Sequence, residues 1–139
     1  MVHIYGLSAS EQDHVSTASR IAADVALPNA ADVDVQARFP AESMKALADA
    51  GFYGLCLQKE VGGKGEGVRA FAGVVEELAG ACGSTAMVYV MHVAATQAIA
   101  MSSILADRDS ILGEIAAGRH LTTLAFSETG SRSQFWAPI

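Results

Sequence analysis

The chain has 139 residues, enough for one domain and little more. Hydrophobic residues make up 51% of it and charged residues 17%, a balance that excludes a disordered segment. Acidic residues outnumber basic ones by 15 to 9 and the basic ones do not cluster, which predicts no nucleic-acid partner. Two cysteines are too few for a disulfide framework, and the first residues have no cationic region followed by an apolar core. We therefore expect a reduced, cytoplasmic setting.

The first predicted helix begins after Ser8. This serine and Glu11 have the spacing of a capping box, in which each side chain accepts a hydrogen bond from the other residue's backbone. Apolar residues then recur at three- and four-residue steps. We expect the helix to end at residues 27–29 (LPN), because proline cannot continue the hydrogen-bond ladder, and residues 29–39 to form a connecting loop.

A second helix is predicted from Pro40 to Gly51, since a proline at the first helical position loses no hydrogen bond. A short apolar run follows at residues 52–57, and a glycine-rich stretch (VGGKGEG) at residues 61–67. This stretch matches neither of the phosphate-binding patterns GxGxxG and GxxxxGK(S/T). We interpret it as a mobile connection between helices.

Three further helices are predicted, which gives an all-α bundle of about five helices. The third covers residues 68–81, the fourth begins with Ser84 as its cap, and the fifth covers residues 107–117 and stops at Gly118. The predicted apolar stripe of the third helix consists of Val68, Phe71, Ala72, Val75, Leu78 and Ala79.

No charged residue occurs between residues 78 and 106. A membrane helix needs roughly 20 predominantly apolar residues. This stretch relies on alanine, however, and it contains His92 and Gln97, which are costly in lipid. We therefore expect no membrane span but a helix surrounded by protein on most sides, with His92 as a satisfied core or interface group.

After residue 120 the pattern changes from helix to strand. Residues 121–127 (LTTLAFS) alternate roughly in polarity and contain β-forming residues, and a polar run and an apolar ending follow. A single strand leaves its backbone groups unpaired. We therefore expect a helical domain over residues 1–120 and, over residues 121–139, the first strand of a missing β domain, as in a truncated chain or one completed by another chain.

Two groups of residues are candidates for a functional site. The polar run at residues 127–134 offers hydroxyls, backbone N–H groups and the Arg132 guanidinium, which are groups that bind phosphates or the polar edge of a heterocycle. A plain polar turn is the alternative. The methionines Met87, Met91 and Met101 either fill gaps in the core or line a pocket for a flexible apolar ligand.

An ordered set of motifs extends over about a hundred residues. The motifs are FPxE at residues 39–42, LAxAGFxG at 47–54, GGxG at 62–65, VEELA at 75–79, STA at 84–86, VMH at 90–92, LGEIAAG at 112–118 and LAFSETGSRS at 124–133. In this order they resemble the N-terminal half of the acyl-CoA dehydrogenase family. The resemblance implies a helical domain that precedes a β-barrel-like middle domain and a C-terminal helix bundle. It also implies FAD as the cofactor and a homo-oligomer.

Five residues are expected to contact the flavin, four of them by the resemblance and Arg132 by its charge. Leu124 and Phe126 match the strand residues that contact its ring system. Ser127 stands where the family has threonine, and its hydroxyl is expected to donate to the pyrimidine edge of the flavin. Ser133 matches the serine near the pyrophosphate, and Arg132 could add a charge-assisted contact to phosphate.

The resemblance also assigns Met87, Val90 and Met91 to the wall of the acyl-chain pocket. The implied reaction removes hydrogen from a CH–CH bond of an acyl thioester, with hydride transfer to the flavin. The family's glutamate base belongs to its C-terminal domain, so we expect no catalytic residue in this chain, and no metal site.

Three residues depart from the family's flavin signature. Thr129, Arg132 and Gln134 stand where the pattern usually has proline, glycine and aspartate. Two alternatives therefore stay open, a flavin-dependent monooxygenase of the same superfamily and a non-catalytic helical interaction subunit. The expected partners are an acyl-CoA or related small molecule, together with a second copy of the chain or a complementing chain.

Overall fold

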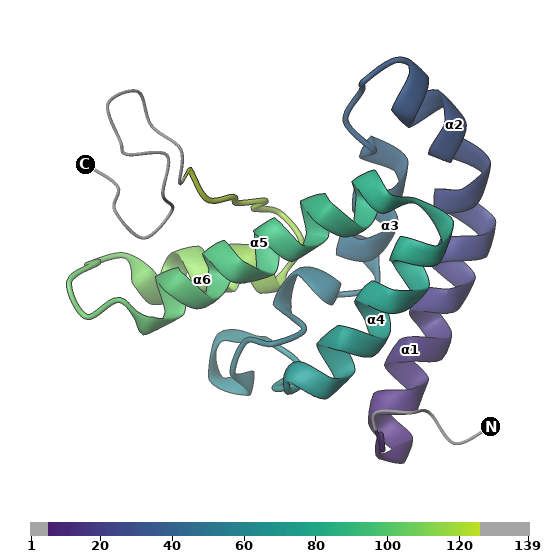
Figure 1. Cartoon of the computed structure of the whole chain (residues 1–139). Helices are drawn as coiled ribbons and strands as arrows, with labels where there is room; N and C mark the ends of the chain where they lie inside the picture. Colours follow the sequence, from purple (N-terminus) through teal and green to yellow (C-terminus); the bar gives the residue numbers. More distant parts are fainter. Residues whose placement is uncertain (1–5, 126–139) are drawn as a thin grey trace, which may run out of the picture.

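The computed structural model describes residues 6–125, and within these residues the fold is an all-α bundle without a strand (Figure 1). The elements are α1 (Ala9–Ile21), the π-helical turn η1 (Ala22–Ala26), α2 (Leu27–Val35), α3 (Ala41–Asp49), the 3-10 turns η2 (Phe52–Gly54) and η3 (Lys59–Val61), α4 (Val68–Ala81), α5 (Gly83–Met101) and α6 (Arg108–Ala116). Because α1, η1 and α2 form one continuous helix, the described chain has the predicted five long helices.

The first helix begins as predicted but does not end at the proline. Ser8 and Glu11 form both hydrogen bonds of the capping box. The helix then continues through Pro28 to Val35, so the loop predicted over residues 29–39 is largely helical. The π-turn explains the difference. Leu27 N–H donates to a carbonyl five residues back, that of Ala22, and this wider turn allows a proline without an N–H to follow.

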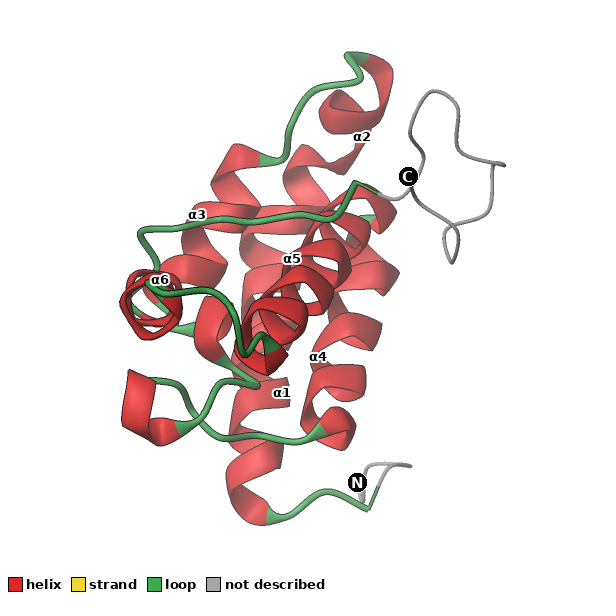
Figure 2. Ribbon diagram, turned by 90° about the vertical axis from the view of Figure 1, so that its left-hand side faces the viewer, coloured by secondary structure: helices red, strands yellow, loops and turns green. Residues whose placement is uncertain are grey.

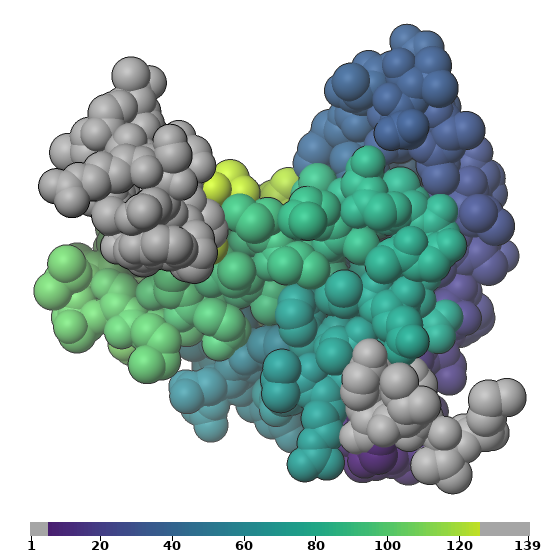
Figure 3. Space-filling model, viewed as in Figure 1, coloured from purple at the N-terminus to yellow at the C-terminus, as the bar shows by residue number. Residues whose placement is uncertain are grey.

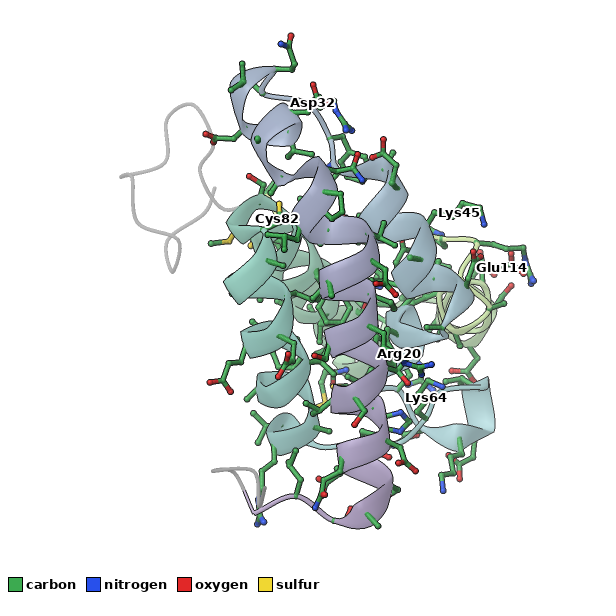
Figure 4. The ribbon with its side chains drawn as sticks, turned by 90° about the vertical axis from the view of Figure 1, so that its right-hand side faces the viewer. Arg20, Asp32, Lys45, Lys64, Cys82 and Glu114 are labelled. Carbon is green, nitrogen blue, oxygen red and sulfur yellow. The ribbon has the colours of Figure 1, made fainter. Side chains whose placement is uncertain are left out.

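The core lies where α1, α3, α4 and α5 meet around η2. Helix α1 packs along α4, and α4 packs along α5 (Figures 1 and 4). The largest fully buried side chains are Tyr89, Phe52, Met44, Leu47, Leu55, Leu57, Leu78 and Ile115. The apolar run at residues 52–57 therefore lies at the centre of the bundle.

Helix α4 has the predicted bounds, and part of its predicted stripe faces the core: Leu78 is fully buried, and Phe71 and Val75 are partly buried against the core. Val68 is 76% exposed and Ala79 is also exposed, whereas Ala70 and Val74 are fully buried. The start of α5 differs too. The N-cap is Cys82 and not Ser84, because the backbone is still extended at Cys82, whose Sγ accepts a hydrogen bond at the first turn.

The glycine-rich loop is packed against the apolar run and is not a free connection. Lys64 N–H donates to the Gly54 carbonyl at 3.0 Å, and Gly65 N–H donates to the Leu57 carbonyl at 2.8 Å. At Gly63 a Cβ atom would stand 2.2 Å from the Leu57 carbonyl oxygen. Only glycine allows the two segments to approach so closely, and the interpretation of this stretch as mobile is wrong.

Helix α6 leads into the segment that was predicted to begin a strand. Gly118, with φ of +75°, ends the helical turn, as predicted. Residues 121–125 then cross beside α5 without pairing as a strand (Figure 2). The remaining residues of the predicted strand, Phe126 and Ser127, lie outside the described part of the chain.

Helix α5 is long and apolar enough to cross a membrane when length and composition alone are considered. In the bundle it is a core helix, and its side chains Tyr89, His92 and Thr96 are fully buried and hydrogen-bonded. This packing explains the lack of charge along its inner face without a membrane.

Candidate functional site

The inner face of α5 is attached to the apolar run by side-chain hydrogen bonds. The Tyr89 hydroxyl donates to the Phe52 carbonyl at 2.9 Å, and Gln97 Nε2 donates to the Cys56 carbonyl at 3.4 Å. His92 lies between them, with Nε2 at 3.2 Å from the Tyr53 carbonyl. The Phe52 carbonyl also accepts from Leu55 N–H at 3.2 Å, so the Tyr89 hydroxyl is its second donor. Together the three bonds attach α5 to the backbone of the apolar run.

His92 also contacts the segment after α6. Its Nδ1 accepts a hydrogen bond from the Thr122 backbone N–H at 3.2 Å. A backbone N–H can only donate, so Nδ1 carries no proton, and the proton of the neutral ring is on Nε2, facing the Tyr53 carbonyl. Burial lowers the pKa of His92, which favours this neutral form. The prediction of a satisfied core histidine is confirmed.

A groove of about 330 Å³ lies on the outer face of α5. It is lined by Phe39, Met87, Val88, Met91, Leu121, Thr122 and Thr123. Figure 3 shows a notch on this side of the molecule, above α5 and between the tip that contains α2 and the yellow residues near the end of the described chain. Met87 is 61% exposed and Phe39 is 50% exposed. No lining residue carries a charge, so the groove suits an apolar ligand.

The structure brings two of the three predicted acyl-wall residues together. Met87 and Met91 line the same groove, one helical turn apart. Val90 is turned by roughly 100° from Met91 about the helix axis. It lines a different hollow of about 360 Å³, whose walls include Cys56 and Phe71. Burial raises the pKa of the Cys56 thiol to about 11, so this thiol stays protonated at neutral pH.

Of the five predicted flavin contacts, Leu124 is the one in the described part of the chain. It is half-buried and lines a hollow of about 440 Å³ with, among others, Ala95, Ile99 and Leu105. Thr122 and Thr123 line both this hollow and the Met87–Met91 groove. The other predicted contacts, Phe126, Ser127, Arg132 and Ser133, lie outside the described residues.

Sequence reasoning did not place Phe39 or residues 121–123 at the candidate pocket. Phe39 precedes Pro40 in one of the motifs that carry the family resemblance, and this position was the available signal. The contact of residues 121–123 with α5 joins positions about thirty residues apart, and no local pattern encodes it. Among residues 6–125, no group of three or more histidine, cysteine or acidic side chains is arranged to hold a metal ion.

Comparison with known proteins identifies the family. Residues 8–119 match the family described as the acyl-CoA dehydrogenase N-terminal domain. The chain belongs to this family. It is 30% identical to an acryloyl-CoA reductase (NADH) of Anaerotignum propionicum, over 88% of this chain and 32% of that protein. It is also 30% identical to a probable acyl-CoA dehydrogenase of Mycobacterium tuberculosis, over 85% of this chain and 31% of that protein.

The match extends to structure. A solved structure described as the electron transferring flavoprotein of Acidaminococcus fermentans aligns with a TM-score of 0.75 and 25% identity, over 83% of this chain and 30% of that chain. The chain thus spans about a third of the length of the curated relatives it matches. The shared region is the helical bundle described above, so the fold predicted from the motifs is confirmed.

Proposed function

We propose that this chain forms the N-terminal part of an FAD-dependent, acyl-CoA dehydrogenase-like oxidoreductase that acts on CH–CH bonds of acyl thioesters. One observation carries the proposal. Met87 and Met91 line a groove together with residues 121–123, and the next residue along the chain, Leu124, is a predicted flavin contact. In this proposal residues 121–123 contribute to the acyl groove and Leu124 contacts the flavin, so substrate and flavin lie next to each other. A hydride transfer between them requires this proximity.

The groove has the chemistry that a fatty acyl chain needs. Methionine side chains are flexible and polarizable, so they adapt to an apolar chain of variable shape. The groove has no charged lining residue, and burial of a methylene group contributes about 0.8 kcal/mol. Related proteins whose names contain a CoA thioester also support this substrate class. A 3-sulfinopropanoyl-CoA desulfinase of Variovorax paradoxus is 34% identical over 63% of this chain and 22% of that protein.

The proposed flavin contacts need both apolar and polar groups. Leu124, half-buried on an apolar wall, fits the part that meets the flat ring system. Ser127, Ser133 and Arg132 would supply the polar contacts to the pyrimidine edge and the phosphates. FAD supplies the hydride acceptor when bound, and this chain supplies position. We assign residues 1–120 to the helical domain, residues 121–139 to the start of the middle domain, and no catalytic base to either.

Methyl NMR of the four methionines in the described part of the chain tests this proposal, because their positions differ. Met87 and Met91 lie in the groove, Met44 in the core, and Met101 is exposed elsewhere on α5. Addition of hexanoyl-CoA or dodecanoyl-CoA is expected to shift the Met87 and Met91 resonances, more strongly for the longer chain, and to leave Met44 and Met101 unchanged. Free CoA is the control. Equal shifts with free CoA, or no shift at Met87 and Met91, would contradict the proposal.

A second candidate function, docking onto a protein partner, is favoured by exposed apolar residues on and after α5. Met101 is 84% exposed and Ile104 is 93% exposed. Exposed apolar patches of this kind often mark interaction surfaces. In the same NMR experiment, docking between copies of the chain would shift the Met101 resonance as the protein concentration rises without any thioester. An acyl pocket alone would leave that resonance unchanged.

A further inference from the structure

The segment after α6, which lines both the acyl groove and the hollow at Leu124, makes a single hydrogen bond to the rest of the described chain. Among the described residues, residues 120–125 make one hydrogen bond, from the Thr122 N–H to His92 Nδ1. The imidazole is fully buried and is held on its other side by the Tyr53 carbonyl and by the Tyr53 ring, with 4.5 Å between the ring centroids. One histidine thus connects three separate elements, namely η2, α5 and the segment after α6.

The consequences for the proposed site follow from chain geometry. Thr122 is the point of attachment, and its neighbours Leu121 and Thr123 line the groove with Met87. Leu124 is two residues further on and lines the adjacent hollow. Consecutive Cα atoms are 3.8 Å apart, so a shift of Thr122 moves the lining of the groove and of the hollow together.

We propose that His92 is a positioning residue of this site: its unprotonated Nδ1 holds residues 121–124 against α5 and thereby sets the distance between the acyl groove and the first flavin contact. The role of His92 in positioning the two sites rests on the proposed function. The hydrogen bond between His92 and Thr122 is present without substrate or cofactor. His92 touches neither ligand in this account and acts through Thr122.

The attachment depends on the protonation state of the ring. Protonation adds a hydrogen to Nδ1, which then faces the Thr122 N–H, and two donors cannot bond to each other. The titratable groups that face His92 are Tyr53, which packs on the ring, and His120, whose electrostatic repulsion also lowers the pKa of His92. Burial is the largest cause that lowers the pKa of His92. The bond is therefore present at neutral pH and is lost in acid, as the pH falls through the pKa that His92 has in the fold, which lies below the ordinary histidine value of about 6.5.

The lowered pKa of His92 also makes the stability of the fold depend on pH. Below about pH 6.5 the unfolded chain takes up a proton on His92 more readily than the folded chain does, because the pKa of His92 is lower in the fold. The free energy of unfolding therefore falls as the pH decreases below about 6.5. Above that value His92 contributes no further change.

Two variants test the hydrogen bonds of the two ring nitrogens of His92 one at a time. In His92→Asn the side-chain oxygen takes the place of Nδ1 and accepts from Thr122 at every pH. In His92→Gln the side-chain amide takes the place of Nε2, so it reaches the Tyr53 carbonyl but not Thr122. The measurement is the hydrogen-exchange protection factor of the Thr122 amide, divided by that of the Val93 amide inside α5, between pH 7.5 and pH 4.5.

We expect the wild-type ratio to fall at least tenfold across this range. It should stay constant in His92→Asn and be low at both ends in His92→Gln. A wild-type ratio that does not change with pH, or a Thr122 amide as protected in His92→Gln as in the wild type at pH 7.5, would overturn the proposal. If a variant does not fold, the wild-type profile alone decides. No flavin or thioester is present, so failure here leaves the function proposal standing, and failure of the methionine NMR test leaves this one standing.

Discussion

The two faces of α5 have the same lack of charge for different reasons. On the inner face Tyr89 and His92 are fully buried and bonded to the carbonyls of η2. On the outer face Met87 and Met101 are 61% and 84% exposed, and no Asp, Glu, Lys or Arg lies between them in the sequence. Burial explains the inner face. The outer face needs another explanation, and a ligand or a partner that covers apolar surface provides one.

This difference shows what an uncharged stretch of sequence can and cannot indicate. Residues 83–101 satisfy the length and composition of a membrane helix, yet in the structure one face of this helix is bonded in the core and the other lines an open groove. The following variants disturb either the core side of α5 or its exposed side, and each is paired with a control variant elsewhere in the bundle.

The largest effect is expected at Gly63, which keeps the inner side of the bundle in place. Replacement by alanine puts a Cβ atom 2.2 Å from the Leu57 carbonyl oxygen, so the backbone must move. Gly63→Ala should lower the free energy of unfolding by roughly 3 kcal/mol, measured by urea denaturation.

Gly80→Ala is the matched control for this substitution. A Cβ atom at Gly80 meets nothing within 4 Å, and the residue lies in α4. Alanine is the better helix former by about 0.5–1 kcal/mol, so this variant should be more stable than the wild type. Similar changes in the same direction for the two variants would show that the glycine loop is not packed as described.

A smaller loss is expected when one hydrogen bond of the inner face is removed. Tyr89→Phe removes one of the two donors to the buried Phe52 carbonyl, which keeps its bond from Leu55 N–H, and should cost about 0.5–1.5 kcal/mol in the same denaturation experiment. Tyr53→Phe removes a hydroxyl that makes no hydrogen bond with any other described residue, and it should change stability by less than about 0.5 kcal/mol. Equal costs for the two substitutions would show that the bond to Phe52 does not hold α5.

Local signals predicted most of the fold. The capping box at Ser8, the bounds of α4 and the turn at Gly118 follow from patterns within a few residues. The end predicted at Pro28 was wrong because one π-turn accommodates a proline that would break a regular helix, and no sequence signal marks that turn. The glycine loop was misinterpreted because its rigidity comes from contacts with the Leu57 backbone.

The candidate site was predicted less completely than the fold. The family resemblance singled out Met87 and Met91, but Val90, one residue before Met91, lines a separate hollow. Helical periodicity turns Val90 by roughly 100° from Met91, so it was the signal that could have separated the two residues. The bond between His92 and Thr122 depends on how α6 returns the chain across α5, which is a property of the tertiary structure.

The most direct test of the central claim compares two methionines on the exposed side of one helix. Met87 lines the proposed acyl groove, and Met101 is exposed outside it. The measurement is the dissociation constant of dodecanoyl-CoA for Met87→Lys and Met101→Lys. A lysine in the groove must be desolvated next to the acyl chain, so Met87→Lys should weaken binding at least roughly tenfold, which is about 1.4 kcal/mol, and Met101→Lys should leave it unchanged. Equal affinities for the two variants would contradict the assignment of the outer face of α5 as a substrate wall.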